Sequence, residues 1–516
     1  MTPTSSQQPL DCLDGLGEFV RAMMADWNVP GLSVAVIKDG QTVFAEGFGY
    51  RDVAAKLPVT QATLFPICSC TKAFTCAALA ILVDEGKLDW DLPVRKYLPE
   101  LRLADQVVAE RITARDLVTH RSGLPRHDLF WYSGVRSRAD LLASLEHLEF
   151  SKDFRTTYQY NNLMYMVAGC LIERITGIAW EDFVRARLLD PLGMAAAVTS
   201  LAAARATADH ARPYVEKPEQ APEGVAWAPS SEELGEPVIA VPYFEFMDGI
   251  NPAGGILAGA AEMANWVALN LAKGKRGETR IVSEAQIEQM QLPHMATPAP
   301  QKYPELPPLG GYGLGWALYS YRGYRVVSHG GAIDGFSTLV ALLPEANAGL
   351  VVLSNLGGSP TPTLIAYEVF DLFLGLKAKS SADVPVVDWS ARFRAERLEA
   401  KDTSEKRRLT QRADRVVGTS PSHPLASYIG DYSHPAYGRV AIRLAEDGTD
   451  ASGLKITLNS LEGRLEHYHF DIFENVRITG DRVRVSFLTG PKGTIDSLAS
   501  PLEQGVSDII FRRVAE

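Results

Sequence analysis

A serine and a lysine three residues apart stand at the head of an apolar run. Ser69 and Lys72 precede Ala73–Val83, a stretch that predicts a buried helix. If this helix begins at or near Ser69, the spacing puts both side chains on one face, within reach of each other. A lysine whose pKa is depressed by burial and nearby positive charge can take the proton of a serine hydroxyl. Backbone N–H groups at the helix start can stabilise a developing oxyanion. The stretch therefore predicts a nucleophile, its base and half of an oxyanion hole.

The same S-x-x-K spacing recurs at Ser452 and Lys455, so the spacing alone is weak evidence. The second copy lies in a Gly-rich, strand-like region with no helix after it, and we interpret it as a chance match. Cys68 and Cys70 flank Ser69 and offer a rival thiol nucleophile. Cysteine catalysis needs a partnered thiolate, and no histidine lies near them in the sequence. Ser69 is therefore the predicted nucleophile.

Tyr160 and Asn162 stand at a turn before a second strong helix pattern, Asn161–Ile175. A tyrosine whose pKa is lowered by adjacent positive charge can act as a general base or relay a proton to a leaving group. The Asn162 amide can hold Lys72 and a substrate carbonyl. Taken alone, the pair fits a core tyrosine and a helix-capping asparagine better.

A histidine and two glycines, His329–Gly331, follow the predicted strand Tyr324–Ser328. Glycines there would let a substrate backbone lie against the strand. The N–H of Ala332 is the predicted second oxyanion donor beside that of Ser69. Taken alone, the histidine fits an ordinary turn residue.

The elements that must position these residues follow from the hydrophobic pattern. Alternating apolar and β-branched runs predict strands, and Asp39-Gly40 predicts a hairpin turn. Three strands in series between residues 324 and 353 predict an antiparallel sheet. We expect an α+β fold, an antiparallel sheet flanked by helices, with a helical subdomain inserted at roughly residues 85–250. The acidic, Pro-rich stretch Pro213–Pro242 predicts a long loop. The main predicted elements are strands Leu32–Lys38, Thr42–Tyr50, Phe336–Leu343 and Gly349–Leu353, and helices Ile112–Thr119, Trp180–Leu189, Ala260–Lys273 and Pro362–Leu376.

Three segments are predicted along the chain. Residues 1–376 hold all the candidate site residues, and residues 377–422 form a linker that contains a charged helix, Ala391–Arg412. Residues 423–516 alternate short strands with turn signals, which predicts an all-β barrel or sandwich. The charged helix is most simply a solvated linker, although it could also be a contact between subunits of a homo-oligomer.

Composition excludes several classes of partner. The 516 residues carry a net charge of −11, which argues against nucleic acid or an anionic membrane as the main partner. Five cysteines without a spaced framework predict reduced, buried thiols. The polar N-terminus has neither a basic nor a long apolar signal region, so we expect a cytoplasmic protein, with a processed periplasmic form as the alternative.

Other catalytic motifs are missing from the sequence. It has no H-E-x-x-H zinc motif and no G-x-S-x-G nucleophile elbow, which argues against a zinc peptidase and an α/β-hydrolase. His467 and His469 alternate on a predicted strand as a zinc pair would, but no third ligand stands at a suitable spacing. We expect no metal and no cofactor.

Three motifs in order resemble the serine β-lactamase and penicillin-binding-protein superfamily, nearest its class C-like branch of D-aminopeptidases, D-alanyl-D-alanine carboxypeptidases and esterases. The resemblance covers roughly residues 15–376. The C-terminal part more loosely resembles the lipocalin-like domains of some peptidase relatives. The motifs are Ser69/Lys72, Tyr160/Asn162 and His329/Gly331, with the family-like phrases Asp116–Leu124, Pro191–Met194, Ala253–Gly255 and Tyr312–Trp316 between them.

The resemblance implies a role for each of these residues. Ser69 would be acylated, Lys72 and Tyr160 would share the acid–base work in an unassigned order, and Asn162 would position substrate. His329 and Gly330 stand where many relatives have Lys and Thr or Ser. Because a neutral histidine grips a carboxylate less firmly than lysine does, we do not expect strong binding of β-lactams. Asn161 also departs from the small residue that is usual between Tyr and Asn.

The expected activity is metal-independent acyl transfer at an amide bond of a short or unusual peptide. A peptidase for linearised microcystin is one relative that fits. Two alternatives stay open, a carboxylesterase for short acyl esters and a catalytically silent binding or assembly protein. Intact Ser69, Lys72, Tyr160 and His329 argue against the silent alternative.

Overall fold

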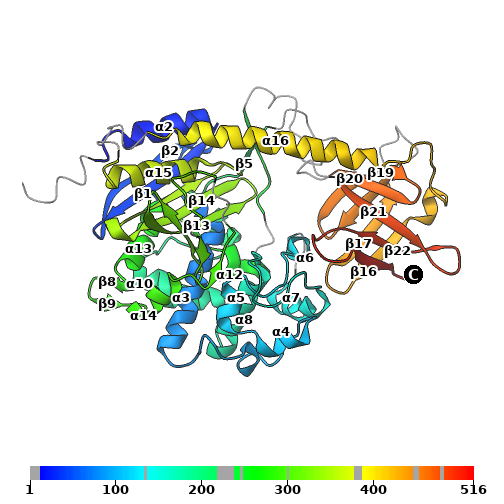
Figure 1. The fold of residues 1–516 in the computed structure, drawn as a ribbon, viewed down its shortest axis with the longest axis horizontal. Helices are drawn as coiled ribbons and strands as arrows, with labels where there is room; N and C mark the ends of the chain where they lie inside the picture. The colour runs from blue at the N-terminus through cyan, green and yellow to red at the C-terminus, as the bar shows by residue number, and fades with distance from the viewer. Residues whose placement is uncertain are drawn as a thin grey trace, which may run out of the picture.

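The chain folds into an α+β body and a C-terminal β-barrel, joined by one long helix (Figure 1). This confirms the predicted fold class. The computed structural model describes residues 12–132, 136–217, 237–244, 248–298, 302–308, 310–376, 386–445, 453–476 and 482–515. Among these residues no single helix is long and apolar enough to cross a membrane, and one bent pair, Leu163–Thr176 with Trp180–Leu192, passes on length and composition alone.

A nine-stranded sheet forms the centre of the body, in the order β10-β11-β12-β13-β14-β15-β1-β2-β3, and all its pairings are antiparallel. The N-terminal strand β1 pairs with β15, so the beginning and the end of the body meet in mid-sheet. The strands are β1 Gly31–Lys38, β2 Gln41–Asp52, β3 Leu57–Pro58, β10 Met295–Ala296, β11 Gly311–Tyr312, β12 Ala317–Tyr321, β13 Tyr324–Ile333, β14 Phe336–Leu343 and β15 Ala348–Ser354.

Both faces of the sheet are covered, which explains why its central strands are buried almost continuously and are rich in apolar residues. Helices α2 (Leu16–Asp26) and α15 (Thr361–Phe373) pack with Val34 and Val36 on one face. Helix α13 (Ala260–Leu271) packs on the other face. The alternation of side chains along each strand therefore divides the core of the body into two layers.

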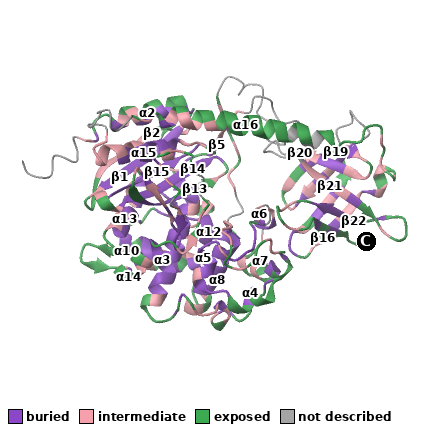
Figure 2. Cartoon of the chain, in the orientation of Figure 1, coloured by how far each residue is buried: buried purple, intermediate pink, exposed green. Residues whose placement is uncertain are grey.

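Helix α3, Thr71–Asp84, runs through the middle of the core (Figure 2). Its residues Thr71–Leu82 are all buried, as expected of a helix that is apolar all round. Phe74 stacks on Trp266 of α13 at 3.8 Å between ring centroids. The other helices of the body are α4 Gln106–Arg111, α5 Ala114–Val118, α6 Asp128–Trp131, α7 Arg138–Ser144, α8 Leu163–Thr176, α9 Trp180–Val184, α10 Asp190–Leu192, α11 Leu201–Arg205, α12 Asn251–Gly254 and α14 Glu284–Met290.

The predicted loop Pro213–Pro242 has structured ends. Strands β5 (Tyr214–Glu216) and β6 (Val238–Ala240) pair antiparallel, which the acidic, Pro-rich composition did not predict. The interior of the loop lies outside the described residues. Two further two-stranded pairs join β4 (Phe65–Pro66) to β7 (Leu257–Ala258) and β8 (Lys275–Arg276) to β9 (Thr279–Arg280).

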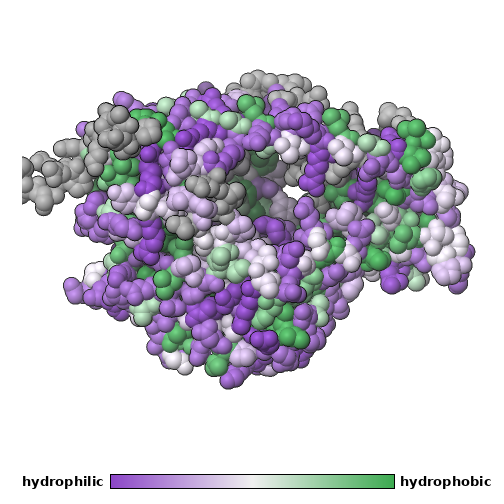
Figure 3. Space-filling view, viewed as in Figure 1, coloured by the Kyte–Doolittle hydropathy of each residue, from purple (hydrophilic) through white to green (hydrophobic). Residues whose placement is uncertain are grey.

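Helix α16, Trp389–Ala413, crosses from the body to the barrel and occupies most of the predicted linker. Its first turns are anchored on the body, where Trp389 is buried and Arg392 pairs with Glu305 at 2.8 Å. Beneath it lies a hollow of about 1620 Å³, bordered by the helix, the body and barrel residues 501–506 (Figure 3). The helix thus spans an open chamber between the body and the barrel.

The barrel closes on itself in the order β16 to β23, because its last strand pairs with its first. All neighbouring pairs are antiparallel, so the sheet has no free edge. The strands are β16 Gly430–His434, β17 Gly438–Leu444, β18 Leu454–Leu458, β19 Leu461–His469, β20 Ile472–Val476, β21 Arg482–Thr489, β22 Ile495–Ser500 and β23 Ile509–Arg513.

Candidate active site

Ser69 lies in a 3-10 turn, Cys68–Cys70, that runs directly into α3. The α-helix that was predicted to begin at or near Ser69 begins two residues later, at Thr71. The turn is tied to the sheet, because the Thr338 hydroxyl donates to the carbonyl of Ile67 at 3.0 Å and the Cys70 thiol donates to that of His329 at 3.0 Å. The nucleophile is therefore held between the core helix and strand β13.

Lys72 is fully buried, and its ammonium group makes three hydrogen bonds. Its Nζ donates to Ser69 Oγ at 3.0 Å, to Asn162 Oδ1 at 2.8 Å and to the carbonyl of Ala253 at 2.8 Å. Burial, and then the charge of Arg126, lower the pKa of Lys72 to about 7. A large fraction of Lys72 is therefore neutral near pH 7, with a lone pair beside the serine hydroxyl.

Tyr160 packs against the same lysine. The centroid of its ring lies 4.8 Å from Lys72 Nζ and 5.3 Å from Arg126 Cζ. Burial raises the pKa of Tyr160, and a hydrogen bond with Ser69 offsets only part of this increase. The expectation of a pKa lowered by positive charge is wrong, because burial is the larger effect. Tyr160 is thus a neutral phenol rather than a phenolate base.

The two asparagines after Tyr160 do different work. Asn162 accepts the hydrogen bond from Lys72, whereas Asn161 points into the protein and is fully buried. Asn161 Nδ2 donates to the carbonyl of Leu124 at 3.1 Å, and its Oδ1 accepts from the N–H of Met164 at 3.0 Å. The unusual residue between Tyr and Asn therefore joins the start of α8 to the 120–128 loop.

Strand β13 continues through His329–Gly331 to Ile333, five residues beyond its predicted end. His329 Nε2 is hydrogen-bonded to the Tyr312 hydroxyl at 2.9 Å. Burial, and then the charge of Lys72, lower the pKa of His329 to about 3, so this side chain is neutral. The site thus carries a neutral side chain at this position.

The two glycines of this strand meet different surroundings. A Cβ on Gly331 would lie 2.3 Å from Thr338 Oγ1 and 2.5 Å from the carbonyl oxygen of Ile67. Close packing against the Ser69 segment therefore requires Gly331, which the substrate-contact argument did not predict. Gly330 has only one neighbour near such a Cβ, the carbonyl oxygen of Thr338 at 3.8 Å. Only Gly330 leaves open space beside the strand.

A cavity of about 70 Å³ opens beside Ser69. Ser69, Asn162 and Ala332 border it, so the nucleophile and the second predicted oxyanion donor face one space. The rest of its wall is mostly apolar or aromatic, with one carboxylate, Asp334, at the rim. These wall residues include Trp131, Leu201, Tyr243, Phe244, Leu257, Ile333 and Phe336.

Sequence reasoning missed two charged residues at this site. Arg126 Nε donates to Asp128 Oδ2 at 2.6 Å, and Asp128 Oδ1 accepts from Asn162 Nδ2 at 3.4 Å and from the Trp131 indole at 3.1 Å. Their charges act on Lys72, that of Arg126 lowering its pKa and that of Asp128 raising it. No motif marks them, because their role arises only from tertiary contacts.

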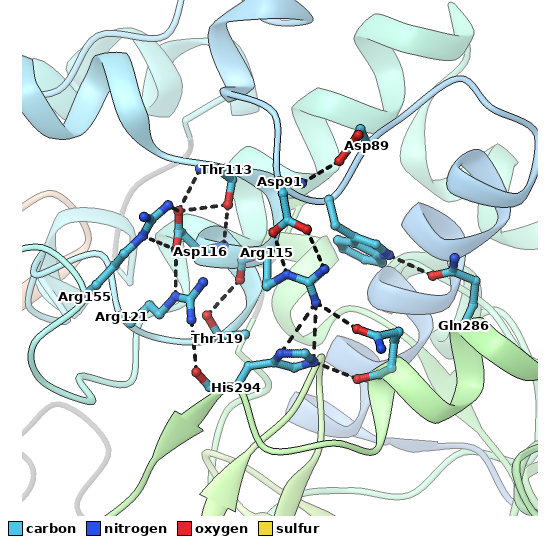
Figure 4. Close-up of polar contacts among 12 residues, drawn as sticks. Asp89, Asp91, Thr113, Arg115, Asp116, Thr119, Arg121, Arg155, Gln286 and His294 are labelled. Carbon is cyan, nitrogen blue, oxygen red and sulfur yellow. Dashed lines mark hydrogen bonds and ion pairs between the residues drawn. The ribbon is translucent and has the colours of Figure 1, made fainter.

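A buried ion-pair network supports the loop that precedes them (Figure 4). Asp116 is fully buried, caps α5 through Thr113, and accepts from Arg121 Nε at 2.6 Å and Arg155 Nη2 at 2.7 Å. Although burial raises the pKa of Asp116, the hydrogen bond from Arg155 and the charge of Arg121 bring it below its usual value. The network fixes the two segments of the chain that lead to His120 and to Tyr160.

Other candidates contribute little to the site. None of the five cysteines, all of them described, forms a disulfide, and burial raises the pKa of the Cys70 thiol to about 12 and that of Cys68 well above its usual value. Within the described ranges, no group of three His, Cys, Asp or Glu side chains could hold a metal ion. His467 Nε2 is hydrogen-bonded to the carbonyl of Phe470 at 2.8 Å, and His469 Nδ1 accepts from the N–H of Val416 at 3.1 Å.

Comparison with known proteins extends these observations. The profile described as Beta-lactamase matches residues 16–372, and that of a domain of unknown function, DUF3471, matches residues 414–513. An unguisins hydrolase of Aspergillus campestris is 31% identical over 458 residues, which span 86% of this chain and 79% of that protein.

Two solved structures are similar in fold. An octameric penicillin-binding protein homologue from Pyrococcus abyssi aligns over 97% of this chain and 100% of its own, with a TM-score of 0.62 and 23% identity. The D-amino acid amidase of Ochrobactrum anthropi SV3 aligns over 72% of this chain and 100% of its own, with a TM-score of 0.58 and 23% identity.

Proposed function

This chain belongs to the β-lactamase family of serine hydrolases, and on that premise we propose that it hydrolyses amide bonds of short peptides through an acyl-enzyme on Ser69. One observation carries the proposal. The buried Nζ of Lys72 lies 3.0 Å from Ser69 Oγ, and burial lowers the pKa of this lysine to about 7. A base with a pKa near the working pH, in contact with a serine, is what acyl transfer needs.

Acylation of Ser69 then follows in order. Lys72 takes the hydroxyl proton as Oγ bonds to the substrate carbonyl carbon, and the N–H groups of Ser69 and Ala332 stabilise the oxyanion. The proton passes through Tyr160 to the leaving nitrogen, the C–N bond breaks, and the amine departs. Lys72 and Tyr160 are then back in their starting protonation states.

Deacylation reverses the proton path. A water molecule gives its proton to Lys72 as its oxygen bonds to the acyl carbon. The bond from that carbon to Ser69 Oγ breaks, and Oγ takes the proton back. The raised pKa of Tyr160 keeps this phenol protonated, which supports a role as a proton relay rather than as the base that begins the reaction.

The walls of the site support an apolar substrate residue next to the cleaved bond. Trp131, Phe244 and Phe336 border the cavity beside Ser69. His329 is neutral, so this position has no cation to anchor a substrate carboxylate. The names of the unguisins hydrolase and of the D-amino acid amidase point in the same direction, toward peptide and amide bonds.

A carboxylesterase is the second candidate. The neutral His329 and the apolar cavity would accept an uncharged acyl ester equally well. A panel of p-nitrophenyl esters, p-nitroanilides and D- and L-amino-acid amides separates the two activities. We expect the amides to be hydrolysed. The kcat/KM of the esters should exceed that of the amides by no more than the greater intrinsic reactivity of an ester bond accounts for. Turnover of esters without turnover of amides would favour the carboxylesterase instead.

Covalent labelling tests the acyl-enzyme directly. A fluorophosphonate should modify Ser69, located by mass spectrometry of the folded protein, and Ser69→Ala should carry no label and show no turnover. Absence of label at Ser69 in folded wild-type protein would overturn the proposal. So would activity that survives in Ser69→Ala and disappears with a chelator.

A further inference from the structure

His127 is a buried residue between two charged residues of the site. Arg126 and Asp128, on either side of it, reach Tyr160 and Asn162, whereas the His127 side chain is buried and contacts Tyr437 and Glu149 instead. The backbone of His127 is left-handed, with φ 45° and ψ 40°. Few residues other than glycine adopt this conformation, although histidine does so more often than most, and the surroundings of His127 stabilise it here.

The C-terminal barrel supplies those surroundings. Glu503, in the loop before β23, accepts a hydrogen bond from the backbone N–H of His127. The hydroxyl of Tyr437, in the turn between β16 and β17, is hydrogen-bonded to His127 Nδ1 at 2.7 Å. His127 Nε2 is in turn hydrogen-bonded to the carbonyl of Glu149 at 2.9 Å. Both His127 and Tyr437 are fully buried.

Contacts around this point join the same two barrel loops to the body. The Tyr437 ring packs edge-on against Phe130 of α6, with ring centroids 6.3 Å apart. The N–H of Ser507 donates to the Glu149 carboxylate at 3.2 Å, and Arg136 donates to the carbonyl of Ala436. The docking is therefore specific in both polar and apolar contacts, and it is centred on His127.

We propose that the barrel completes the catalytic site, with Tyr437 and Glu503 acting as positioning residues that hold His127 and thereby fix Arg126 and Asp128 against Tyr160 and Asn162. The inference rests on the proposed function of Ser69 and Lys72. It assigns the C-terminal domain a part in catalysis, although none of the barrel residues that the structure describes borders the cavity beside Ser69.

Loss of this support has a defined electrostatic effect. If the 126–128 segment relaxes, Lys72 loses the nearby charges of Arg126 and Asp128. Arg126 acts on it more strongly than Asp128 does, so the lysine should bind its proton more tightly. The charged and titratable groups around Glu503 and Tyr437 are Arg126, His127, Asp128, Glu149 and His434. Of these, Arg126, His127, Asp128 and Glu149 lie on the body, and their spacing from the barrel would change.

The test uses the full chain and three barrel variants. Tyr437→Phe removes one hydrogen bond and keeps the ring packing, Glu503→Ala removes the acceptor for the His127 N–H, and Glu503→Gln restores an acceptor without charge. Glu462→Gln is the matched control, because Glu462 pairs with Lys455 at 2.7 Å on the barrel surface. Steady-state kinetics with a p-nitroanilide from pH 5 to 10 and the rate of fluorophosphonate labelling at Ser69 are measured for each.

We expect Tyr437→Phe and Glu503→Ala to lower kcat about ten- to a hundredfold with little change in KM, and to move the acid limb of kcat/KM to higher pH. Glu503→Gln should recover most of the loss, and Glu462→Gln should behave as wild type. Thermal melting of every variant shows that the kinetic change belongs to folded protein.

Contrary outcomes separate this inference from the proposed function. Wild-type rates and an unshifted acid limb in folded Tyr437→Phe and Glu503→Ala would overturn the inference and leave the acyl-enzyme intact. An equal loss in Glu462→Gln would also overturn it. Failure of the wild type itself to label at Ser69 would instead remove the proposed function.

Discussion

The fold keeps the Lys72 side chain partly deprotonated near neutral pH. Burial is the main cause and the neighbouring Arg126 is the second, and together they lower its pKa to about 7 from the usual value of 10.5. His329 is neutral for a similar reason, with a pKa lowered to about 3 by burial and then by Lys72. The site therefore works with little net charge, which suits proton transfer in a desolvated space.

Removing the charge of Arg126 should raise the pKa of Lys72. In the proposed mechanism Lys72 must be neutral to accept the Ser69 proton, so activity rises with pH through its pKa. Arg126→Gln should therefore shift the acid limb of kcat/KM upward, with a loss of roughly two- to fivefold at pH 7 and almost none at pH 9. A pH–rate profile on an amide substrate measures the shift.

Asp128→Asn is the matched change of opposite sign. The charge of Asp128 raises the pKa of Lys72. Removing this charge should therefore move the acid limb of kcat/KM to lower pH. Shifts of both variants in one direction would mean that the two side chains act through geometry rather than through charge. An unchanged acid limb of kcat/KM in both variants would show that a group other than Lys72 sets the pH dependence.

At the scale of secondary-structure elements, the close contact between strand β13 and the Ser69 turn determines the shape of the site. Gly331→Ala should push the strand away from Ile67 and Thr338, because its Cβ would lie 2.5 Å and 2.3 Å from atoms of these residues. We expect a loss of about 1–3 kcal/mol in the free energy of unfolding and a fall in kcat, because the N–H of Ala332 would leave the oxyanion position. Urea unfolding and steady-state kinetics report the two effects.

Gly330→Ala is the control for this prediction. Its Cβ would meet only the carbonyl oxygen of Thr338, at 3.8 Å, so the free energy of unfolding should stay close to that of wild type. Any change it causes should appear in KM, because Gly330 faces open space beside the strand. Equal destabilisation by the two substitutions would contradict the packing argument.

The sequence predicted the elements that local patterns specify. The apolar runs that predicted helices over Ala73–Val83 and Asn161–Ile175 placed α3 and α8 within about two residues of their bounds, because a long apolar pattern is encoded locally. Gly177, in the left-handed conformation, caps the end of α8. Strand β13 was predicted too short, since the pair Gly330-Gly331 weakens a strand pattern. Pairing with β14 through Ile333 overrides that local preference.

The parts of the site that were missed depend on contacts between distant residues. Arg126 and Asp128 stand in a loop with no motif, and only the fold brings them to Lys72, more than 50 positions away. The raised pKa of Tyr160 was missed for the same reason, because burial is a property of the packed core. The closure of the barrel required the pairing of β16 with β23, which no local pattern specifies.

At the scale of the whole molecule, α16 sets where the barrel can dock. The helix has 25 residues and is thus about 37 Å long, and those side chains of its second half that the structure describes are exposed (Figure 2). Insertion of seven helix-forming residues between Lys401 and Asp402 would keep the phase of the helix and lengthen it by about 10 Å. We expect kcat to fall as it does in Glu503→Ala, because the barrel loops could no longer reach His127.

Two measurements distinguish this effect from damage to either folded part. Far-ultraviolet circular dichroism should show intact secondary structure, and cleavage by a protease in the 120–128 loop should become faster as the barrel contact is lost. Undiminished turnover in the lengthened chain would show that the spacing set by α16 does not matter to the site.

The continuous helix between body and barrel also determines how strong their contact needs to be. A partner on a covalent tether meets its docking surface at an effective concentration of the order of millimolar, independent of how dilute the protein is. The few contacts made by Tyr437, Glu503 and Ser507 can therefore keep the barrel docked. A single cut in the exposed half of α16 would turn docking into a bimolecular event, and the activity would then vary with protein concentration.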